Sequence, residues 1–319
     1  RFIFSLMVCL ALLIPTIVEA QPDVIVGDLP NTNSYGTNTG TGIYAYSVAT
    51  TSCNIGTANL NWQANNNQHP VIAQDMWRLH EGRFTQIGSS WLKHGFCALQ
   101  NTGLCAGCGG GGGCLSYLTP GCADPYSAGL NGNQSNLGPR SQVNAFTGFF
   151  PYPYNAPPCP SGQGTICRRL QVQESDMVGL PGALFFVSAQ YVASDDADFG
   201  NQANNASYRR VNISQSGNHS LSFVGGTQQQ APPIQAWQDN QPSVTLVDVE
   251  VPNEGLFIAG YDVTDNGNGT YNYEYAVYNM YSDRSARSFS VPYPAGATII
   301  EHGFHDLTWH SGEPYDGTD

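Results

Sequence analysis

The chain has 319 residues and carries 24 Asp and Glu against 11 Lys and Arg, a formal net charge of −13. A nucleic-acid-binding surface needs clustered basic residues, so this balance argues against a nucleic-acid partner, and it disfavours an anionic membrane surface for the same reason. Only 11% of the residues are charged, whereas Gly, Asn, Ser, Thr and Tyr are abundant, which favours a β-rich protein with a neutral, hydrogen-bonding surface.

Residues 1–20 have the pattern of a secretory signal peptide. An apolar run over residues 3–14 is followed by Val18-Glu19-Ala20, a small-x-small cleavage pattern before Gln21. The run is shorter than the roughly 20 residues that a membrane-spanning helix needs, and no later segment approaches that length. The sequence therefore predicts a secreted protein, located in the extracellular space, in a periplasm or at the cell surface, with no membrane span in the mature chain.

Eight cysteines remain once Cys9 is removed with the signal peptide, and an even number in an exported chain predicts four disulfides. They are Cys53, Cys97, Cys105, Cys108, Cys114, Cys122, Cys159 and Cys167. Eight cysteines allow 105 pairings, and proximity in the chain favours Cys159 with Cys167 and a closed set between Cys97 and Cys122. The Cys105-x-x-Cys108 spacing also suits a zinc knuckle, but an oxidising compartment favours disulfides over zinc.

The region 21–166 is predicted to be a loop-rich, cysteine-containing β region. Alternating or β-branched residues predict strands at 43–48, 70–79 and 83–92, the last two joined by a turn at Glu81-Gly82. Beyond Cys97 the chain has little periodicity, many Pro and Asn residues and a glycine run at 109–113. Cross-linking by cysteines explains this long irregular stretch.

The region 167–319 is predicted to be an antiparallel β-sandwich. Strand-like runs occur at 170–173, 183–193, 207–213, 220–224 and 244–251. A hairpin follows, with strands at 256–263 and 270–280, and runs at 289–291 and 298–310 complete the series. Because no helical periodicity intervenes, the expected fold class is all-β, and the position of the last run suggests a sandwich truncated at its C-terminus.

Four blocks of the chain resemble a group of uncharacterised secreted bacterial proteins. They are residues 67–74 (NQHPVIAQ), 91–96 (WLKHGF), 121–126 (GCADPY) and 273–279 (YEYAVYN). The second half, with SFSVP at 288–292, is also similar to immunoglobulin-like extracellular sandwich modules. The resemblances imply an extracellular protein with an immunoglobulin-like second half, and they transfer no catalytic residues.

Histidines are the most informative polar residues of the chain. Five of them are candidate metal ligands: His69, His94, His302, His305 and His310. In a regular final strand His302, Asp306 and His310 share one face, but residues four apart on a strand, such as His302 and Asp306, are about 13 Å apart, so a site there needs partners from elsewhere. Imidazoles suit copper or zinc, and the acidic turns at 194–198 and 262–268 make calcium the less favoured alternative.

No motif for nucleophilic catalysis stands out, since the chain lacks a Gly-x-Ser-x-Gly elbow, and the catalytic residues are unknown. Two functions fit the sequence. The first is a secreted or cell-surface binding or structural module that recognises a glycan or a protein. The alternative is a secreted metal-dependent enzyme, an oxidoreductase or hydrolase that uses copper or zinc in a histidine-built site. Whether the protein is an enzyme therefore stays open at this point.

Overall fold

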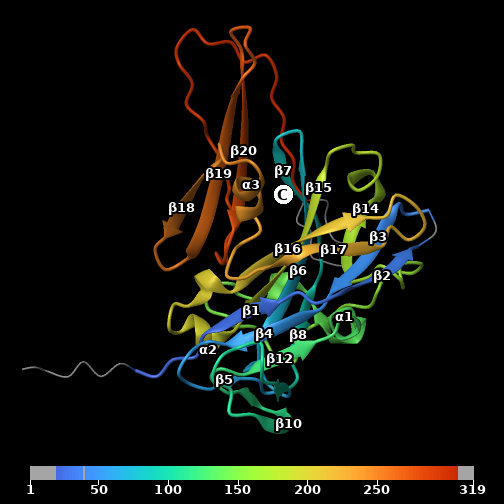
Figure 1. The fold of residues 1–319 in the computed structure, drawn as a ribbon, viewed down its shortest axis with the longest axis vertical. Helices are drawn as coiled ribbons and strands as arrows, with labels where there is room; N and C mark the ends of the chain where they lie inside the picture. Colours follow the sequence, from blue (N-terminus) through green and yellow to red (C-terminus); the bar gives the residue numbers. More distant parts are fainter. Residues whose placement is uncertain (1–18, 39, 308–319) are drawn as a thin grey trace, which may run out of the picture.

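The computed structural model describes residues 19–38 and 40–307 (Figure 1). Strands dominate it, and every pair of neighbouring strands among these residues is antiparallel. The predicted all-β fold class is therefore confirmed, while the sandwich and its immunoglobulin-like arrangement stay predictions. Residues 1–18 of the predicted signal peptide lie outside the described part of the chain.

The largest sheet has ten strands. Eight of them follow one path, in the order β17 (Leu221–Gln228), β16 (Ala206–Ile213), β15 (Leu184–Val192), β6 (Val71–His80), β7 (Arg83–Ser89), β14 (Leu170–Gln173), β3 (Ile43–Val48) and β2 (Thr32–Thr37). The other two are β8 (Leu92–His94), which pairs with β6, and β13 (Leu137–Gly138), which pairs with β8. Strands from both sides of Cys167 are neighbours here, because β15 pairs with β6 and β14 lies between β7 and β3.

Smaller sheets and short helices complete the molecule. The strands are β1 (Val24–Asp28), β4 (Thr50–Asn54) and β12 (Ala123–Tyr126) in one sheet, β5 (Leu60–Asn61) with β11 (Tyr117–Leu118), β9 (Ala98–Gln100) with β10 (Gly111–Leu115), and β18 (Thr245–Val251), β19 (Gly255–Asp265) and β20 (Tyr271–Asn279). The α-helices are α1 (Ala128–Asn131), α2 (Ser194–Ala197) and α3 (Gln235–Asn240). Single 3-10 turns span Gln134–Asn136, Arg140–Gln142, Glu174–Asp176 and Gln202–Asn204.

One face of the ten-stranded sheet packs against the β1-β4-β12 sheet. Their shared core contains Val26 of β1 and Tyr126 of β12 together with Tyr46 and Met76 of the large sheet, all of them buried. Successive residues of a strand point to opposite faces, so Trp77, the neighbour of Met76, enters a second core on the other side. The large sheet is thus covered on both faces.

The second core joins the large sheet to the three-stranded sheet. Trp77 and Phe186 lie in it beside Trp237 of α3, and β19 contributes Leu256 and Ile258. Beyond this contact, β19 and β20 project away from the body (Figure 1). The sheet is anchored at its base by apolar packing, while the hairpin end extends into solvent.

Local patterns predict several strands closely. The strands predicted at 43–48 and 170–173 are β3 and β14, residue for residue. The predicted turn between β6 and β7 is formed by Glu81 and Gly82, whose φ angles are 52° and 80°. Two consecutive left-handed residues are the signature of a tight hairpin turn, and glycine adopts that conformation without strain.

The last predicted strand is wrong where the structure describes it. Residues 298–307 contain no strand, and neither do residues 289–291. Pro292 and Pro294 cannot donate a ladder hydrogen bond, and the one backbone bond in this stretch closes a turn from Ala297 to Pro294. The expected alignment of His302 with Asp306 on a strand face is therefore absent, and His310 lies outside the described residues.

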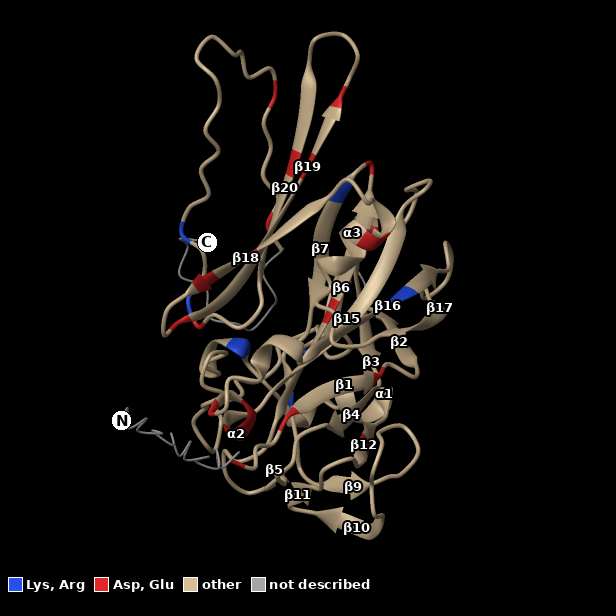
Figure 2. Ribbon diagram, turned by 60° about the vertical axis from the view of Figure 1, so that its left-hand side comes forward, with Lys and Arg blue, Asp and Glu red and all other residues tan. Residues whose placement is uncertain are grey.

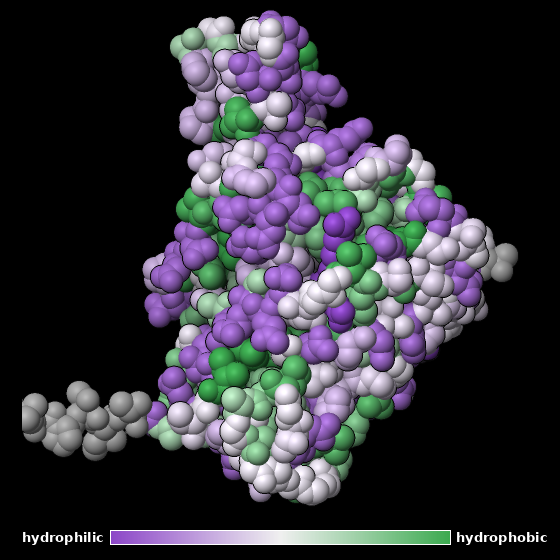
Figure 3. Space-filling view, viewed as in Figure 1, coloured by the Kyte–Doolittle hydropathy of each residue, from purple (hydrophilic) through white to green (hydrophobic). Residues whose placement is uncertain are grey.

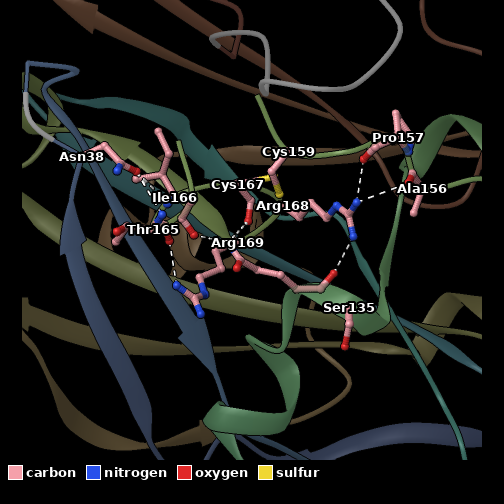
Figure 4. Close-up of a disulfide and its surroundings, with 12 residues drawn as sticks. Asn38, Ser135, Ala156, Pro157, Cys159, Thr165, Ile166, Cys167, Arg168 and Arg169 are labelled. Atoms are coloured by element: carbon pink, nitrogen blue, oxygen red, sulfur yellow. Dashed lines mark hydrogen bonds between the residues drawn. A yellow bond between two sulfur atoms is a disulfide. The ribbon is translucent and has the colours of Figure 1, made fainter. Parts of the chain in front are cut away.

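The disulfide between Cys159 and Cys167 closes a short loop against the large sheet (Figure 4). Next to it, the guanidinium of Arg168 donates to the carbonyl oxygens of Gln134 at 2.7 Å and Pro157 at 2.6 Å. The same guanidinium lies 5.0 Å from the ring centroid of Trp91, a cation–π contact. The Cys159–Cys167 disulfide confirms the pairing predicted from proximity in the chain. Its surroundings are those of a structural cross-link.

Charged residues are sparse over the whole ribbon, and acidic positions outnumber basic ones (Figure 2). Hydrophilic and apolar residues are interspersed over the face seen in Figure 3. Among the helices of the described residues, none has the length and apolar character needed to cross a membrane.

Candidate functional site

Two of the five candidate metal ligands meet in the structure. His94 ends β8, and β8 pairs with the start of β6 so that His94 lies opposite Val71, close to His69. The Nε2 atom of His69 is 3.0 Å from Nδ1 of His94, and both imidazoles are buried. The structure therefore brings together two histidines that the sequence proposes as partners.

The other two candidate histidines among the described residues, His302 and His305, are not part of this pair. His302 and His305 are exposed, and Nε2 of His305 lies 3.3 Å from the carbonyl oxygen of Gln86 on β7. Within residues 19–38 and 40–307, no three His, Cys, Asp or Glu side chains are grouped so that they could hold a metal ion. No metal site is visible among the described residues.

Hydrogen bonds determine which ring nitrogens of the pair carry protons. Nδ1 of His69 is 2.8 Å from the carbonyl oxygen of Gln63, which can only accept, so this nitrogen is the donor. Nε2 of the neutral His69 ring then accepts from Nδ1 of His94. Burial lowers the pKa of His69, and it lowers the pKa of His94 to about 3 with further contributions from His69 and Lys93. Both rings are consequently neutral at ordinary pH and have fixed orientations.

Lys93, the single lysine of the chain, lies beside this pair and is fully buried. Its Nζ atom donates to the carbonyl oxygen of His94 at 2.8 Å and lies 5.0 Å from the ring centroid of Phe96 and 5.6 Å from that of Tyr126. Burial lowers the Lys93 pKa to about 8. The ammonium is stabilised by a carbonyl and two aromatic faces, and it supports the segment that carries Phe96.

A pocket of about 300 Å³ opens next to this network. Three segments of the chain line it: Trp62, Gln63, Ala64, Asn65 and Asn66 in the first, Phe96 and Cys97 in the second, and Cys114, Leu115 and Ser116 in the third. All ten lining residues are uncharged, and the disulfide between Cys97 and Cys114 belongs to the wall. The pocket presents an aromatic ring, side-chain amides and a hydroxyl without any ionic group.

One buried hydroxyl, that of Tyr126, connects the Trp62 segment of the pocket to the segment of Phe96 and Cys97. The Tyr126 Oη atom accepts from the indole Nε1 of Trp62 and from the backbone N of Phe96, each at 3.0 Å. It donates to the carbonyl oxygen of Cys97, also at 3.0 Å. Burial raises the Tyr126 pKa to about 12, so the hydroxyl keeps the proton that this last bond requires.

Hydrogen bonds within the chain also shape the amide side of the pocket. The Nδ2 atom of Asn66 donates to Oε1 of Gln63 at 2.8 Å, while Oδ1 of Asn66 accepts from the backbone N of Gln68 at 2.8 Å. The exposed side-chain amide of Asn65 makes no hydrogen bond to the rest of the described chain. Asn65 therefore offers its whole side-chain amide to a ligand.

The remaining disulfides make the neighbouring loops rigid. Cys108 pairs with Cys122, and together with the Cys97–Cys114 bond this forms the closed set that the sequence predicts. Cys105 instead pairs with Cys53 of β4. Because Cys105 and Cys108 belong to different disulfides, neither thiolate is available for the zinc knuckle that their spacing suggested.

The carboxylates of the acidic turn at 194–198 accept hydrogen bonds from other parts of the chain. The Oδ1 atom of Asp196 accepts from the backbone N of Val24 and Oδ2 accepts from Nδ2 of Asn205, both at 2.8 Å. Oδ2 of Asp195 accepts from the backbone N of Asn61 at 2.7 Å. These carboxylates connect the turn to β1 and β5, which explains the cluster without calcium.

Sequence reasoning identified Cys97 and Cys114 as disulfide cysteines but did not predict the pocket that they border. The available signal was the run of amide residues after Trp62, which precedes a buried strand. Comparison with known proteins gives no further assignment, because no family model, no curated protein and no solved structure matches the chain.

Proposed function

We propose that this protein is a secreted extracellular binding module whose pocket recognises a neutral glycan. The observation that carries the proposal is the uncharged lining, in which the Phe96 ring lies near the side-chain amide groups of Gln63 and Asn65. Sugar hydroxyls need amide and hydroxyl partners, and the apolar face of a sugar ring packs on an aromatic side chain. An ionic ligand would find no counter-charge in this lining.

The rigidity of the pocket supports binding. The Cys97–Cys114 disulfide and the Tyr126 hydroxyl hold both walls without a ligand, so little conformational entropy remains to be lost on association. A volume of about 300 Å³ is at the small end of ligand pockets, which favours a short stretch of a glycan chain. The net charge of −13 disfavours polyanionic glycans as ligands.

A glycan array followed by calorimetry tests this function. We expect binding to neutral oligosaccharides, and we expect Phe96→Ala to weaken it about tenfold, which corresponds to about 1.4 kcal/mol. Leu99→Ala is the matched control, because Leu99 is 38% exposed, similar to the 37% of Phe96, but does not line the pocket. An array without neutral-glycan binding, or equal losses in both variants, would contradict the proposal.

The alternative, a copper- or zinc-dependent enzyme, has less support. Nδ1 of His69 bonds to the Gln63 carbonyl and Nε2 to His94, so both nitrogens of this ring are already used. Elemental analysis of protein purified without a histidine tag separates the two functions. Stoichiometric copper or zinc that is lost in His94→Gln would favour the enzyme.

A further inference from the structure

The three-stranded sheet has two faces of different character. Its register places Val247, Ala259 and Val277 side by side, so the odd-numbered residues of all three strands share one face, here called the outer face. The even-numbered residues form the inner face, where Leu256 and Ile258 pack around Trp237. One face of the sheet is therefore part of the core.

The outer face is apolar but open to solvent. Its residues Val247, Val249, Tyr261, Val263, Tyr273 and Val277 are 41% to 54% exposed. Phe289 touches Tyr275 at the β20 edge, with ring centroids 5.3 Å apart. The rest of the described chain leaves about half of the surface of each of these six residues exposed. A sheet face of this kind is normally buried against a second sheet, and contiguous exposed apolar patches of this type mark interaction sites.

We propose that the outer face is the interface of a homodimer in which two copies of this chain pack sheet on sheet. The charge distribution favours a second copy as the partner. Asp265, at the hairpin end, is the one carboxylate among the odd-numbered residues of the three strands, which include no Lys, Arg or His. In a chain with a net charge of −13, this face lets two copies approach without opposing carboxylates.

The size of the face suits a weak, concentration-dependent dimer. β18, β19 and β20 have 7, 11 and 9 residues, which at about 3.4 Å per residue and about 4.8 Å between strands cover about 440 Å². Two copies in contact therefore bury up to about 900 Å², close to the lower limit of about 1,000 Å² for a specific interface.

The side chains of the face also complement each other under two-fold symmetry. Tyr261 pairs with Tyr275 in the register, and Tyr273 and Val277 are equally far from Tyr275 along β20. A two-fold axis across the strands at this level places Tyr273 of one copy opposite Val277 of the other. Tyr273 then faces the smaller Val277 and Val263 faces Ala259, as interdigitating sheets about 10 Å apart require, while Tyr261 and Tyr275 meet their own copies on the axis.

Sedimentation velocity of the full chain, from low to high micromolar concentration, tests the proposal. We expect a monomer–dimer equilibrium whose dissociation constant rises about a hundredfold or more in Val263→Glu, since the two-fold axis places Val263 opposite Ala259 of the other copy and two carboxylates would enter the apolar contact. Ile55→Glu is the matched control, because Ile55 is 44% exposed and lies outside this sheet. Near-ultraviolet circular dichroism verifies that both variants are folded.

A charge-swap pair tests the geometry independently of folding defects. Tyr273→Glu and Val277→Lys should each abolish the dimer, whereas the double variant should restore it, because each new carboxylate then meets an ammonium of the other copy. A wild-type monomer at every concentration overturns the proposal and leaves the face to another protein or a ligand. A dimer that Val263→Glu leaves unchanged overturns it as well.

Discussion

Nδ1 of His94 donates a hydrogen bond to Nε2 of His69 across 3.0 Å, and His69 in turn bonds to Gln63 in the lining of the pocket. The pair holds the pocket lining in position, because Nδ1 of His69 donates to the Gln63 carbonyl oxygen and Gln63 lines the pocket. The histidines that suggested a metal site thus acquire a structural role in the proposed glycan site.

The pair predicts a stability loss in acid. The folded-state pKa of His94 is about 3, below its unfolded value of about 6.5. The neutral ring therefore contributes to the free energy of unfolding above pH 6.5, and this contribution is lost as pH falls toward 3. His94→Asn keeps a donor for His69 but does not titrate. We expect the wild type to lose unfolding free energy relative to this variant over that window in urea titrations. The exposed His302→Asn serves as the control, and an identical pH slope in wild type and His94→Asn would refute the assignment.

Asp196 predicts the opposite pH dependence. Burial is the main cause that raises the pKa of Asp196 to about 7, above the unfolded value of 3.8. The protonated side chain therefore contributes to the free energy of unfolding below pH 3.8, and this contribution is lost as pH rises through 7. The Oδ1 atom of Asn205 is buried without a hydrogen-bond partner. In the variant Asp196→Asn, rotation of the Asn205 amide would let this oxygen accept a hydrogen bond from the new side-chain amide at position 196. We expect this variant to be at least as stable as the wild type at neutral pH and to lack the slope. Asp198→Asn, at an exposed position of the same turn, should keep the slope of the wild type.

The disulfide of the pocket wall should matter for binding as well as for stability. Removing Cys97–Cys114 with a double Ser substitution opens a loop with a sequence separation of 17, which should cost about 3 kcal/mol and abolish glycan binding. The Cys159–Cys167 pair, with a separation of 8, is the control. Its removal should destabilise the protein less and leave the affinity unchanged in calorimetry. Unchanged binding without the Cys97–Cys114 bond would show that this wall is not part of the site.

Gly260 of β19 packs closely against Trp237 of α3. A Cβ atom at this position would lie 3.1 Å from Cζ3 of Trp237 and 3.0 Å from Cδ2 of Leu246. Gly260→Val should therefore lower the unfolding free energy by about 1–3 kcal/mol through overpacking, with a change in tryptophan fluorescence. Ala259→Val on the outer face should have little effect, and equal destabilisation by both substitutions would contradict the described packing.

The sequence by itself determined the elements whose signals are local. β3 and β14 follow from side-chain alternation, the β6–β7 turn follows from Glu81-Gly82, and the Cys159–Cys167 bond follows from a short loop. The pattern also predicted a strand at 298–310, and none forms in its described part, residues 298–307, because a strand needs a neighbour for its backbone hydrogen bonds as well as a suitable pattern.

Only the tertiary structure decided which polar and aromatic side chains meet. Trp62 and Phe96 line one pocket because β8 pairs with β6 and because the Tyr126 hydroxyl bonds to both. The His69–His94 pair depends on the same strand pairing, which brings neither His302 nor His305 to it. Periodicity determines whether a segment can form a strand, but sheet partners lie far apart in the chain, so their choice is made by packing of the whole molecule.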